Sequence, residues 1–456
     1  MTVNGLNAGI VGDGRTIVAI ATATGRGALA LIRASGPGVR ELAATLLVPA
    51  PTVPRRATHC LVRNANGEVI DEVVATLFGE PHSFTGEDLL EVSTHGGLIV
   101  PMAVLAAAIH AGAREAQPGE FTRRAVLNGK LDVLQAEAIG DLVDARSSAS
   151  HRLALSQLDG GLSQRIDALR VRILGLEALL AYDIDFPEED DGPIPRARIE
   201  TCAVELIDSL DLLIATGDQG TLIHHGALVV LAGAPNVGKS SLFNALLGEA
   251  RAIVTEVPGT TRDAIEAMLD LPGWPLRLVD TAGLRPTEDA VERLGLEVSA
   301  RYLRKAVIVL ACVDTPEAME SVGSLRAGTS GSIIVVATKA DLVSESFKTS
   351  ADVAVSAHTG EGLALLLEKI EERLAGVRGA PMPDAPVLTR ARHSLAVQQA
   401  KRQLTEFVVT WRDDLLPASV AATHVRAAGD ALSELIGIVG VDDVLDVVFR
   451  SFCVGK

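Results

Sequence analysis

GAPNVGKS, residues 233–240, is the stretch of this sequence that decides the fold class. It matches the phosphate-binding pattern GxxxxGK[ST] and stands between an apolar run, 228–232, and a helical segment, 241–248. In such a loop the glycines let backbone N–H groups wrap phosphates, and the following helix adds the positive end of its dipole. The sequence therefore predicts a nucleotide-binding P-loop after a strand and before a helix.

Further apolar runs follow the P-loop, and helical segments separate them. They are LRLVD (276–280), VIVLACV (307–313), SIIVVAT (332–338) and VAVSA (353–357). Alternation of this kind is typical of a parallel sheet covered by helices on both faces. We therefore expect an α/β, Ras-like P-loop G domain over residues 226–380.

The chain on either side of this domain shows two other patterns. Helical periodicity runs from 131 to about 216 and resumes at about 388, which predicts one helical domain with the G domain inserted into it. Residues 14–125 mix strands and helices, so an α+β module is expected there. Strands are expected at 16–21, 28–33, 69–78 and 89–93, and a buried helix at 97–111. The predicted domains are 1–128 (α+β), 129–225 (first helical part), 226–380 (G domain) and 381–456 (second helical part with a cysteine-containing tail).

The composition is that of an ordinary globular protein. Of the 456 residues, 48% are hydrophobic and 22% are charged, and this length predicts about two to four domains. The formal net charge of −17 argues against a general nucleic-acid coat, but leaves room for a local basic patch or for RNA delivered by a partner.

The cysteines and the apolar segments indicate the cell compartment. The four cysteines, Cys60, Cys202, Cys312 and Cys453, lie far apart and form no CxxC pair, which disfavours a disulfide framework or structural zinc. The N-terminus lacks the pattern of a signal peptide, and the longest apolar stretch, 98–113, is interrupted and too short to span a bilayer. We expect a cytoplasmic protein without a membrane partner.

The P-loop and two later motifs predict how the phosphates and the metal are held. Lys239 is expected to bridge the β- and γ-phosphates, and the Ser240 hydroxyl to ligate Mg²⁺. DTAG (280–283) supplies Asp280 near the metal and a glycine that senses the γ-phosphate. In PGTTRD (258–263), Thr261 is expected to close on Mg²⁺ only while the γ-phosphate is present.

The choice of base is assigned to TKAD, residues 338–341. Asp341 can accept two hydrogen bonds from the guanine edge, an arrangement that adenine cannot satisfy. The Lys339 stem would pack on the ring, and Ser356-Ala357 would complete the pocket. The motif usually begins with Asn, and Thr338 in that place predicts looser bracing, with ATP as a minor alternative.

Leu284 follows the DTAG glycine, where Ras-like switches carry a water-orienting glutamine. An apolar side chain cannot orient water, and no arginine finger can be assigned from the sequence. Another group must therefore position the nucleophile, and there is room for a cation.

Seven segments, in this order, resemble the MnmE (TrmE) family of tRNA modification GTPases over nearly the whole chain. They are TIVAIATATGRGALALIRASGP (16–37), SFTGEDLLEVSTHGG (83–97), PGEFTRRAVLNGKLDVLQAEAI (118–139), GAPNVGKSSLFNAL (233–246), VPGTTRD (257–263), DTAGLRPTEDAVERLG (280–295) and SFCVGK (451–456).

The resemblance implies a potassium-activated GTPase whose G domains dimerise during hydrolysis. Asn236, Thr255, Val257 and Thr260 match the family's potassium positions, and Glu292 matches its water-orienting glutamate. From the residues alone, Glu292 reads as a solvated helical carboxylate and Asn236 as a loop cap. Together with Lys239 and Thr261, Glu292 makes up the expected catalytic set. The expected nucleotide-binding residues are Asn236, Val237, Gly238, Lys239, Ser240, Ser241, Thr255, Glu256, Val257, Pro258, Gly259, Thr260, Thr261, Asp280, Thr281, Ala282, Gly283, Thr338, Lys339, Ala340, Asp341, Ser356 and Ala357.

For the N-terminal module the resemblance implies a tetrahydrofolate-binding domain that forms a constitutive homodimer. Arg33, Glu91, Lys130 and Lys456 match the positions that contact 5-formyl- or 5,10-methylene-tetrahydrofolate. Without the family, each reads as a structural ion-pair residue. Cys453, in the terminal tail, would lie near this site as a candidate reactive thiol.

The function implied is GTP hydrolysis that drives, with the flavoprotein MnmG, addition of a (carboxymethyl)aminomethyl group at C5 of the wobble uridine of certain tRNAs. A folate one-carbon unit would be the carbon source. The alternatives are an RNA-binding ribosome-assembly GTPase without modification activity and a dimerisation scaffold with a degenerate G domain.

Overall fold

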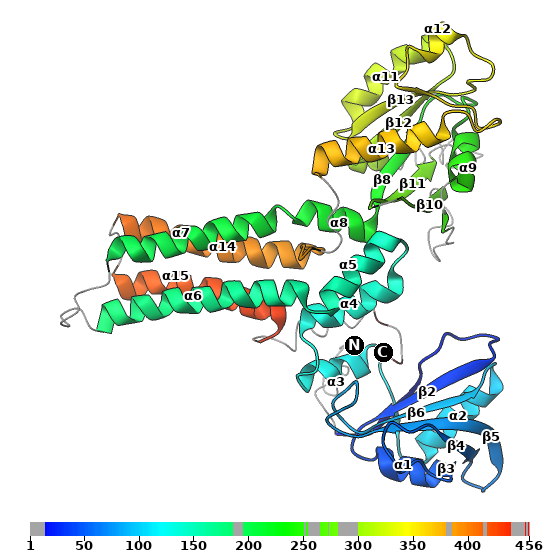
Figure 1. Ribbon diagram of the computed structural model, residues 1–456, viewed down its shortest axis with the longest axis vertical. Coiled ribbons are helices and arrows are strands. Elements are labelled where there is room, and N and C mark those ends of the chain that lie inside the picture. The colour runs from blue at the N-terminus through cyan, green and yellow to red at the C-terminus, as the bar shows by residue number, and fades with distance from the viewer. Residues whose placement is uncertain are drawn as a thin grey trace, which may run out of the picture. The chain divides into compact units, whose positions relative to one another are not determined.

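The computed structural model describes residues 14–185, 195–249, 252–253, 265–271, 273–280, 300–379, 385–413, 417–438, 452 and 455 (Figure 1). The chain divides into two compact units, one formed by residues 1–140 with 436–456 and the other by 141–435. The division into four domains drawn from the sequence stays a prediction. No helix in the described ranges is long and apolar enough to cross a membrane.

The first unit is built on a seven-stranded sheet with the order β3-β4-β5-β6-β2-β1-β7. Neighbouring strands are antiparallel, except that β7 pairs with β1 in parallel. The four strands predicted from the sequence are confirmed, with ends shifted by no more than two residues. The bounds are β1 Ile17–Ile20, β2 Leu29–Ser35, β3 Leu47–Val48, β4 Thr58–Arg63, β5 Val69–Phe78, β6 Leu89–His95 and β7 Arg114–Glu115.

Helix α2 (Ile99–His110) is present where a buried helix was expected, but the expectation of burial was wrong for one side of it, which includes Ile99, Met102 and Ile109. Val104, Leu105 and Ala108 are buried in the sheet-side core with α1 (Val39–Leu46), whereas Ile99 is 79% exposed. Because apolar residues occur on all sides of the helix, its sequence has no polar face that would indicate which side meets the sheet.

The second unit contains a bundle of long helices drawn from both sides of its sheet in the sequence. Helix α7 (Arg196–Ile214) runs beside α14 (Ala391–Arg412), and α6 (Gly161–Asp185) beside α15 (Ala418–Ile436) (Figure 1). Arg196 stacks over the Trp411 ring at 4.3 Å, and Arg426 of α15 pairs with Glu177 of α6 at 2.7 Å. The two helical stretches of sequence therefore pack against each other, as their common periodicity predicts.

Two shorter helices, α5 (Ser148–Leu158) and α8 (Gly217–His225), also belong to the second unit. Helix α3 (Glu120–Leu127) belongs to the first unit, and α4 (Val133–Asp144) spans the boundary between the two units. The segment that returns from the sheet lies against α8, because the Leu388 amide donates to Thr216 Oγ1 at 3.2 Å. Gly220 of α8 packs so close to Leu388 that an added Cβ would lie 2.1 Å from its carbonyl oxygen. The chain thus enters and leaves the sheet region at neighbouring points.

The sheet of this unit has seven strands in the order β14-β13-β12-β8-β11-β10-β9. Strands β14, β13, β12, β8 and β11 are parallel neighbours, and β10 and β9 add an antiparallel edge. The five predicted apolar runs each form one of the parallel strands. The bounds are β8 Ala227–Ala232, β9 Ala252–Ile253, β10 Ile265–Asp270, β11 Pro275–Asp280, β12 Ile308–Val313, β13 Ser332–Ala337 and β14 Val353–Ala354.

Helices cover both faces of this sheet, which explains why its central strands are apolar throughout. Helices α9 (Lys239–Glu249) and α13 (Leu363–Arg378) share one core with side chains of β8 and β11. Helix α11 (Pro316–Gly328) and the short α12 (Glu345–Lys348) cover the opposite face. In a sheet of this kind ligands bind beyond the carboxyl ends of the strands, and the predicted motifs all follow those ends.

Candidate functional site

The P-loop connects β8 to α9 by a backbone path that two glycines make possible. Gly233 has φ +146°, and an added Cβ would lie 2.4 Å from the Cys312 carbonyl oxygen on β12. Gly238 has φ +97°, and the non-glycine Asn236 also lies in the left-handed region at φ +63°. These values place the loop where only small or strain-tolerant residues fit. Val237, 1% exposed, anchors the loop in the core.

Lys239 begins α9, and its ammonium group lies against the loop. Its Nζ donates to the Gly233 carbonyl at 2.9 Å and to the Ala234 carbonyl at 2.7 Å, and the side chain is buried. The positive charge is therefore concentrated at the loop where phosphate oxygens are expected. Ser241 follows in the first turn of the helix.

Ser240 and Asp280 come together across the sheet from α9 and the end of β11. Ser240 Oγ donates to Asp280 Oδ2 at 2.6 Å, and Asp280 is 1% exposed. A hydroxyl and a carboxylate beside a phosphate loop are the hard oxygen donors that Mg²⁺ prefers. The residues present fit a magnesium ion bound between protein and phosphates.

Asp341, which the sequence predicts to recognise the base, is held by the loop after β14. Ser356 Oγ donates to Asp341 Oδ1 at 2.6 Å, and this hydrogen bond lowers the pKa of the Asp341 carboxyl. Asp341 is therefore an ionised acceptor at neutral pH, as recognition of the guanine edge requires. The neighbouring Ala340 is buried, and its amide donates to the Val355 carbonyl at 3.0 Å, directly before Ser356.

Thr338 has a structural role that the sequence did not reveal. Its buried Oγ1 lies 2.5 Å from the Val237 carbonyl and 3.2 Å from the Val313 carbonyl. A single hydroxyl thus connects the base-recognition motif to the P-loop and to β12. Thr338 therefore braces the P-loop directly, although the motif usually has Asn at this position.

Lys339 reaches a partner that sequence reasoning missed. Its Nζ donates to Asp314 Oδ2 at 2.7 Å and to the Asn236 carbonyl at 3.0 Å. The available signal was the acidic residue directly after β12 in ACVD, at the edge where ligands bind. Lys339, with φ +56°, therefore links three loops at the base end of the site.

Several predicted residues lie outside the described part of the chain, and their roles stay predictions. They are Thr255, Glu256, Val257, Pro258, Gly259, Thr260, Thr261, Thr281, Ala282, Gly283, Leu284 and Glu292 near the nucleotide, and Cys453 and Lys456 in the terminal tail.

In the first unit, the predicted folate residues Arg33 and Glu91 are direct cross-strand neighbours on β2 and β6. Arg33 donates to Glu91 Oε1 from Nε at 3.0 Å and from Nη2 at 2.6 Å. The guanidinium also lies 5.5 Å from the centre of the Phe84 ring. Lys130 and Phe84 line one cavity of about 470 Å³, in which Lys130 Nζ donates to the Pro81 carbonyl at 3.1 Å. The Arg33–Glu91 ion pair keeps one-fifth of the Arg33 side chain and one-quarter of the Glu91 side chain exposed.

Comparison with known proteins covers both units. A family model described as "MnmE helical domain" matches residues 133–453, and one described as "GTP-binding protein TrmE N-terminus" matches residues 16–130. A protein of Bordetella parapertussis, "tRNA modification GTPase MnmE", is 42% identical over 448 residues, which are 96% of this chain and 99% of that protein. A Moorella thermoacetica protein of the same description is 39% identical over 461 residues, with 97% and 99% covered.

Among solved structures, the G domain of the T. maritima FeoB iron transporter is 29% identical and covers 32% of this chain and 98% of its own, with a TM-score of 0.26. This overlap is too weak to support a conclusion about the present chain.

Proposed function

The chain belongs to the MnmE family of tRNA modification GTPases, and from this membership we propose the reaction that its GTP hydrolysis drives. That reaction is the addition of an aminomethyl or carboxymethylaminomethyl group at C5 of the wobble uridine in certain tRNAs. The flavoprotein MnmG is the proposed partner for the redox chemistry, and a tetrahydrofolate one-carbon unit is the proposed carbon source. A cytoplasmic homodimer is the proposed form of the protein.

One arrangement carries the GTPase part of this proposal. Ser240 and Asp280 meet at 2.6 Å beside the P-loop, while Asp341 is held by Ser356 at the base end of the same sheet edge. Thr338 connects the two ends through the Val237 carbonyl. Groups suited to the phosphates and to guanine are therefore held relative to each other by hydrogen bonds within the chain.

At the phosphate end, this chain's residues bind and orient. The P-loop amides and the Lys239 ammonium group hold the β- and γ-phosphates, and Ser240 with Asp280 holds the metal. When bound, Mg²⁺ supplies positive charge beside the oxygens that become more negative during hydrolysis. Glu292 is proposed to orient the attacking water, since Leu284 cannot.

Potassium binding is proposed at Asn236, with Thr255, Val257 and Thr260. The support within the described residues is the left-handed conformation of Asn236 in the P-loop, beside the carbonyl that Lys339 already contacts. A monovalent cation there would supply charge that an arginine finger gives in other GTPases.

Folate binding is proposed at Arg33, Glu91, Lys130 and Lys456. A carboxylate can pair with the N–H edge of a pterin, and cations can meet the acidic tail of a folate. The partly exposed Arg33–Glu91 pair and the neighbouring cavity with Lys130 and Phe84 support this placement.

The decisive experiment is mass analysis of wobble nucleosides in tRNA from cells that lack this chain. We expect the modified uridines to disappear and to return when the wild-type chain is restored. Unchanged nucleosides accompanied by a defect in ribosomal subunits would contradict this proposal and favour the ribosome-assembly alternative.

Folate binding is tested separately by calorimetry of the full chain with 5-formyl-tetrahydrofolate. Arg33→Gln should weaken binding by about tenfold or more, since one charge-assisted contact is lost. Arg40→Gln is the matched control, because Arg40 lies in the same unit but pairs with Asp88 at 2.6 Å. Equal loss in both variants would remove Arg33 from the site.

A further inference from the structure

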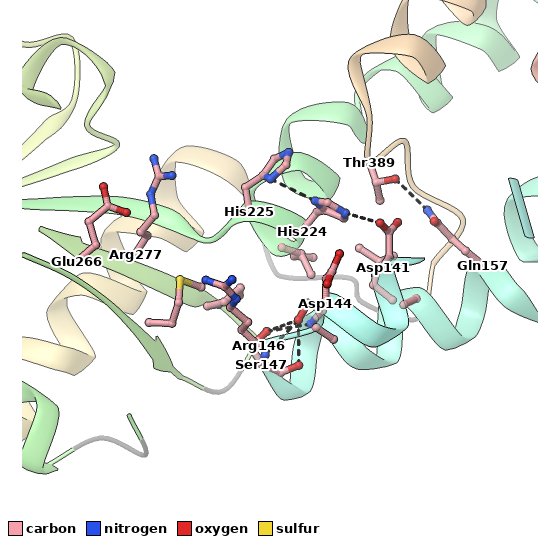
Figure 2. A pocket seen from close by; sticks show the side chains of 17 residues that line it. Asp141, Asp144, Arg146, Ser147, Gln157, His224, His225, Glu266, Arg277 and Thr389 are labelled. Atoms are coloured by element: carbon pink, nitrogen blue, oxygen red, sulfur yellow. Dashed lines mark hydrogen bonds and ion pairs between the residues drawn. The ribbon is translucent and has the colours of Figure 1, made fainter. Parts of the chain in front are cut away.

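A second cavity, of about 450 Å³, lies in the second unit where α4, α5 and α8 meet β10 and β11 (Figure 2). Arg277 and Pro275, which line it, belong to the beginning of β11, whereas Asp280 at the nucleotide site ends that strand. The cavity therefore opens at the edge of the sheet opposite to the P-loop. Its volume is within the range of pockets that bind small molecules.

Two of the three acidic side chains in the cavity wall are already engaged. Asp141 accepts from His224 Nε2 at 2.8 Å and from Arg390 Nη2. Glu266 accepts from the Tyr302 hydroxyl at 2.5 Å. Burial, and then this hydrogen bond, raise the pKa of Tyr302 to about 12, so the hydroxyl remains a donor. The remaining carboxylate, Asp144, is exposed at the rim.

Two arginines and two histidines line the cavity from different elements. Arg277 Nε is buried and has no hydrogen-bond partner among the described residues. Arg146, at the turn between α4 and α5, faces the strands from the helix side (Figure 2). His225 completes this wall. Burial, and then the neighbouring His224, Arg277 and Arg390, lower the pKa of His225, whereas Asp141 raises it.

The wall joins elements that are far apart in the sequence. Beside the cavity, the Ser148 amide donates to both oxygens of Asp270 at 3.1 and 2.9 Å, and Ser148 Oγ donates at 2.7 Å. Asp270 ends β10, and Ser148 begins α5, so a carboxylate from the sheet caps a helix of the bundle. A ligand in the cavity would span the same junction.

We propose that this cavity binds a phosphate group, carried by a small phosphorylated molecule or by the backbone of RNA. Guanidinium groups present paired donors that match phosphate oxygens, and no described residue accepts a hydrogen bond from Arg277 Nε. The inference does not depend on the folate or uridine chemistry proposed above. Phosphate bound between Arg146 and Arg277 would stabilise the junction of α5 with the β10–β11 hairpin.

The test is calorimetry of the full chain, saturated with GDP and Mg²⁺ so that the P-loop is occupied. The probes are inorganic phosphate and a single-stranded hexauridylate. We expect Arg277→Gln to raise the dissociation constant of the probe that binds by at least about tenfold, and Arg277→Lys to have a smaller effect because it keeps the charge. Arg172→Gln is the control, since Arg172 lies on α6 and contacts Ser209 outside the cavity.

Each outcome decides the proposal. Tighter binding of hexauridylate that Arg277→Gln abolishes identifies RNA backbone as the source of the phosphate. Binding of inorganic phosphate alone, with the same sensitivity, identifies a small phosphorylated molecule. The proposal is overturned if neither probe binds below about 10 mM, or if Arg277→Gln and Arg172→Gln behave alike.

Discussion

The Ser356 hydroxyl donates to Asp341 Oδ1 at 2.6 Å, and this contact holds the carboxylate that we propose selects guanine. A carboxylate accepts hydrogen bonds from both N–H groups on the guanine edge. Xanthine carries an oxygen where guanine has its amino group, so an amide at this position would suit xanthine instead.

Asp341→Asn should therefore exchange the base preference. We expect GTP affinity to fall by about 100-fold, as two charge-assisted hydrogen bonds are lost, and affinity for XTP to rise. Calorimetry with both nucleotides measures the exchange. An equal loss of affinity for GTP and XTP would show that the variant damages the site generally.

Ser356→Ala should shift the pH dependence of GTP binding. The Ser356 hydrogen bond lowers the pKa of Asp341, and GTP binding needs the ionised carboxylate. Affinity is therefore retained at neutral pH and lost as the pH falls through the Asp341 pKa. Without the hydrogen bond that pKa is higher, so the loss should begin at a higher pH. Superimposable profiles of affinity against pH for the two proteins would contradict this role.

Thr338→Val should weaken nucleotide binding and the fold together. Valine has the shape of threonine but cannot donate to the buried Val237 and Val313 carbonyls, and unpaired buried acceptors cost about 1–3 kcal/mol. We expect a lower midpoint of thermal unfolding and about tenfold weaker GDP binding. Thr338→Ser keeps the hydroxyl and serves as the control; a similar effect in both variants would assign the loss to packing.

Gly220→Ala should destabilise the junction between α8 and the returning segment. The added Cβ would lie 2.1 Å from the Leu388 carbonyl oxygen, and overpacking of this kind costs about 1–3 kcal/mol or more. Gly175→Ala, in α6, is the matched control because nothing lies within 4 Å of its Cβ position. That helical site should gain about 0.5–1 kcal/mol. Chemical denaturation measures both, and a stabilised Gly220→Ala would refute the close contact.

Glu292→Ala should separate binding from turnover. Removing a residue that only orients water leaves GTP affinity nearly unchanged while hydrolysis falls by about 100-fold or more.

Replacing potassium by sodium should likewise slow hydrolysis, because sodium is too small for the proposed ligands around Asn236. Steady-state rates in the two salts check this. Equal rates would take Asn236 out of the mechanism, and a large loss of GTP binding in Glu292→Ala would do the same for Glu292.

The strands that precede the nucleotide motifs could be predicted from the sequence because their patterns are local. Each motif follows a mostly buried strand, and parallel strands bring their carboxyl ends to one edge, where the structure places Ser240, Asp280 and Asp341. The strands of the first unit were predictable for a similar reason, since short apolar runs ended at turn residues.

The contacts that join elements were not predictable in the same way. Lys339 and Asp314 are 25 residues apart, and Ser148 and Asp270 are 122 apart, so neither pair leaves a local pattern. The exposure of Ile99 was missed because burial of an all-apolar helix depends on which face meets the sheet. Such features arise from tertiary packing, which a single sequence encodes only indirectly.

The neighbouring points at which the chain enters and leaves the β8–β14 region have an evolutionary consequence. Thr216 and Leu388 are 172 residues apart yet are joined by one hydrogen bond, so the helices around them hold both ends of the intervening segment. A segment whose ends already meet can be exchanged or lost in descent without rearranging its host. A chain with a short linker from 225 to 387 should therefore still form the helical bundle.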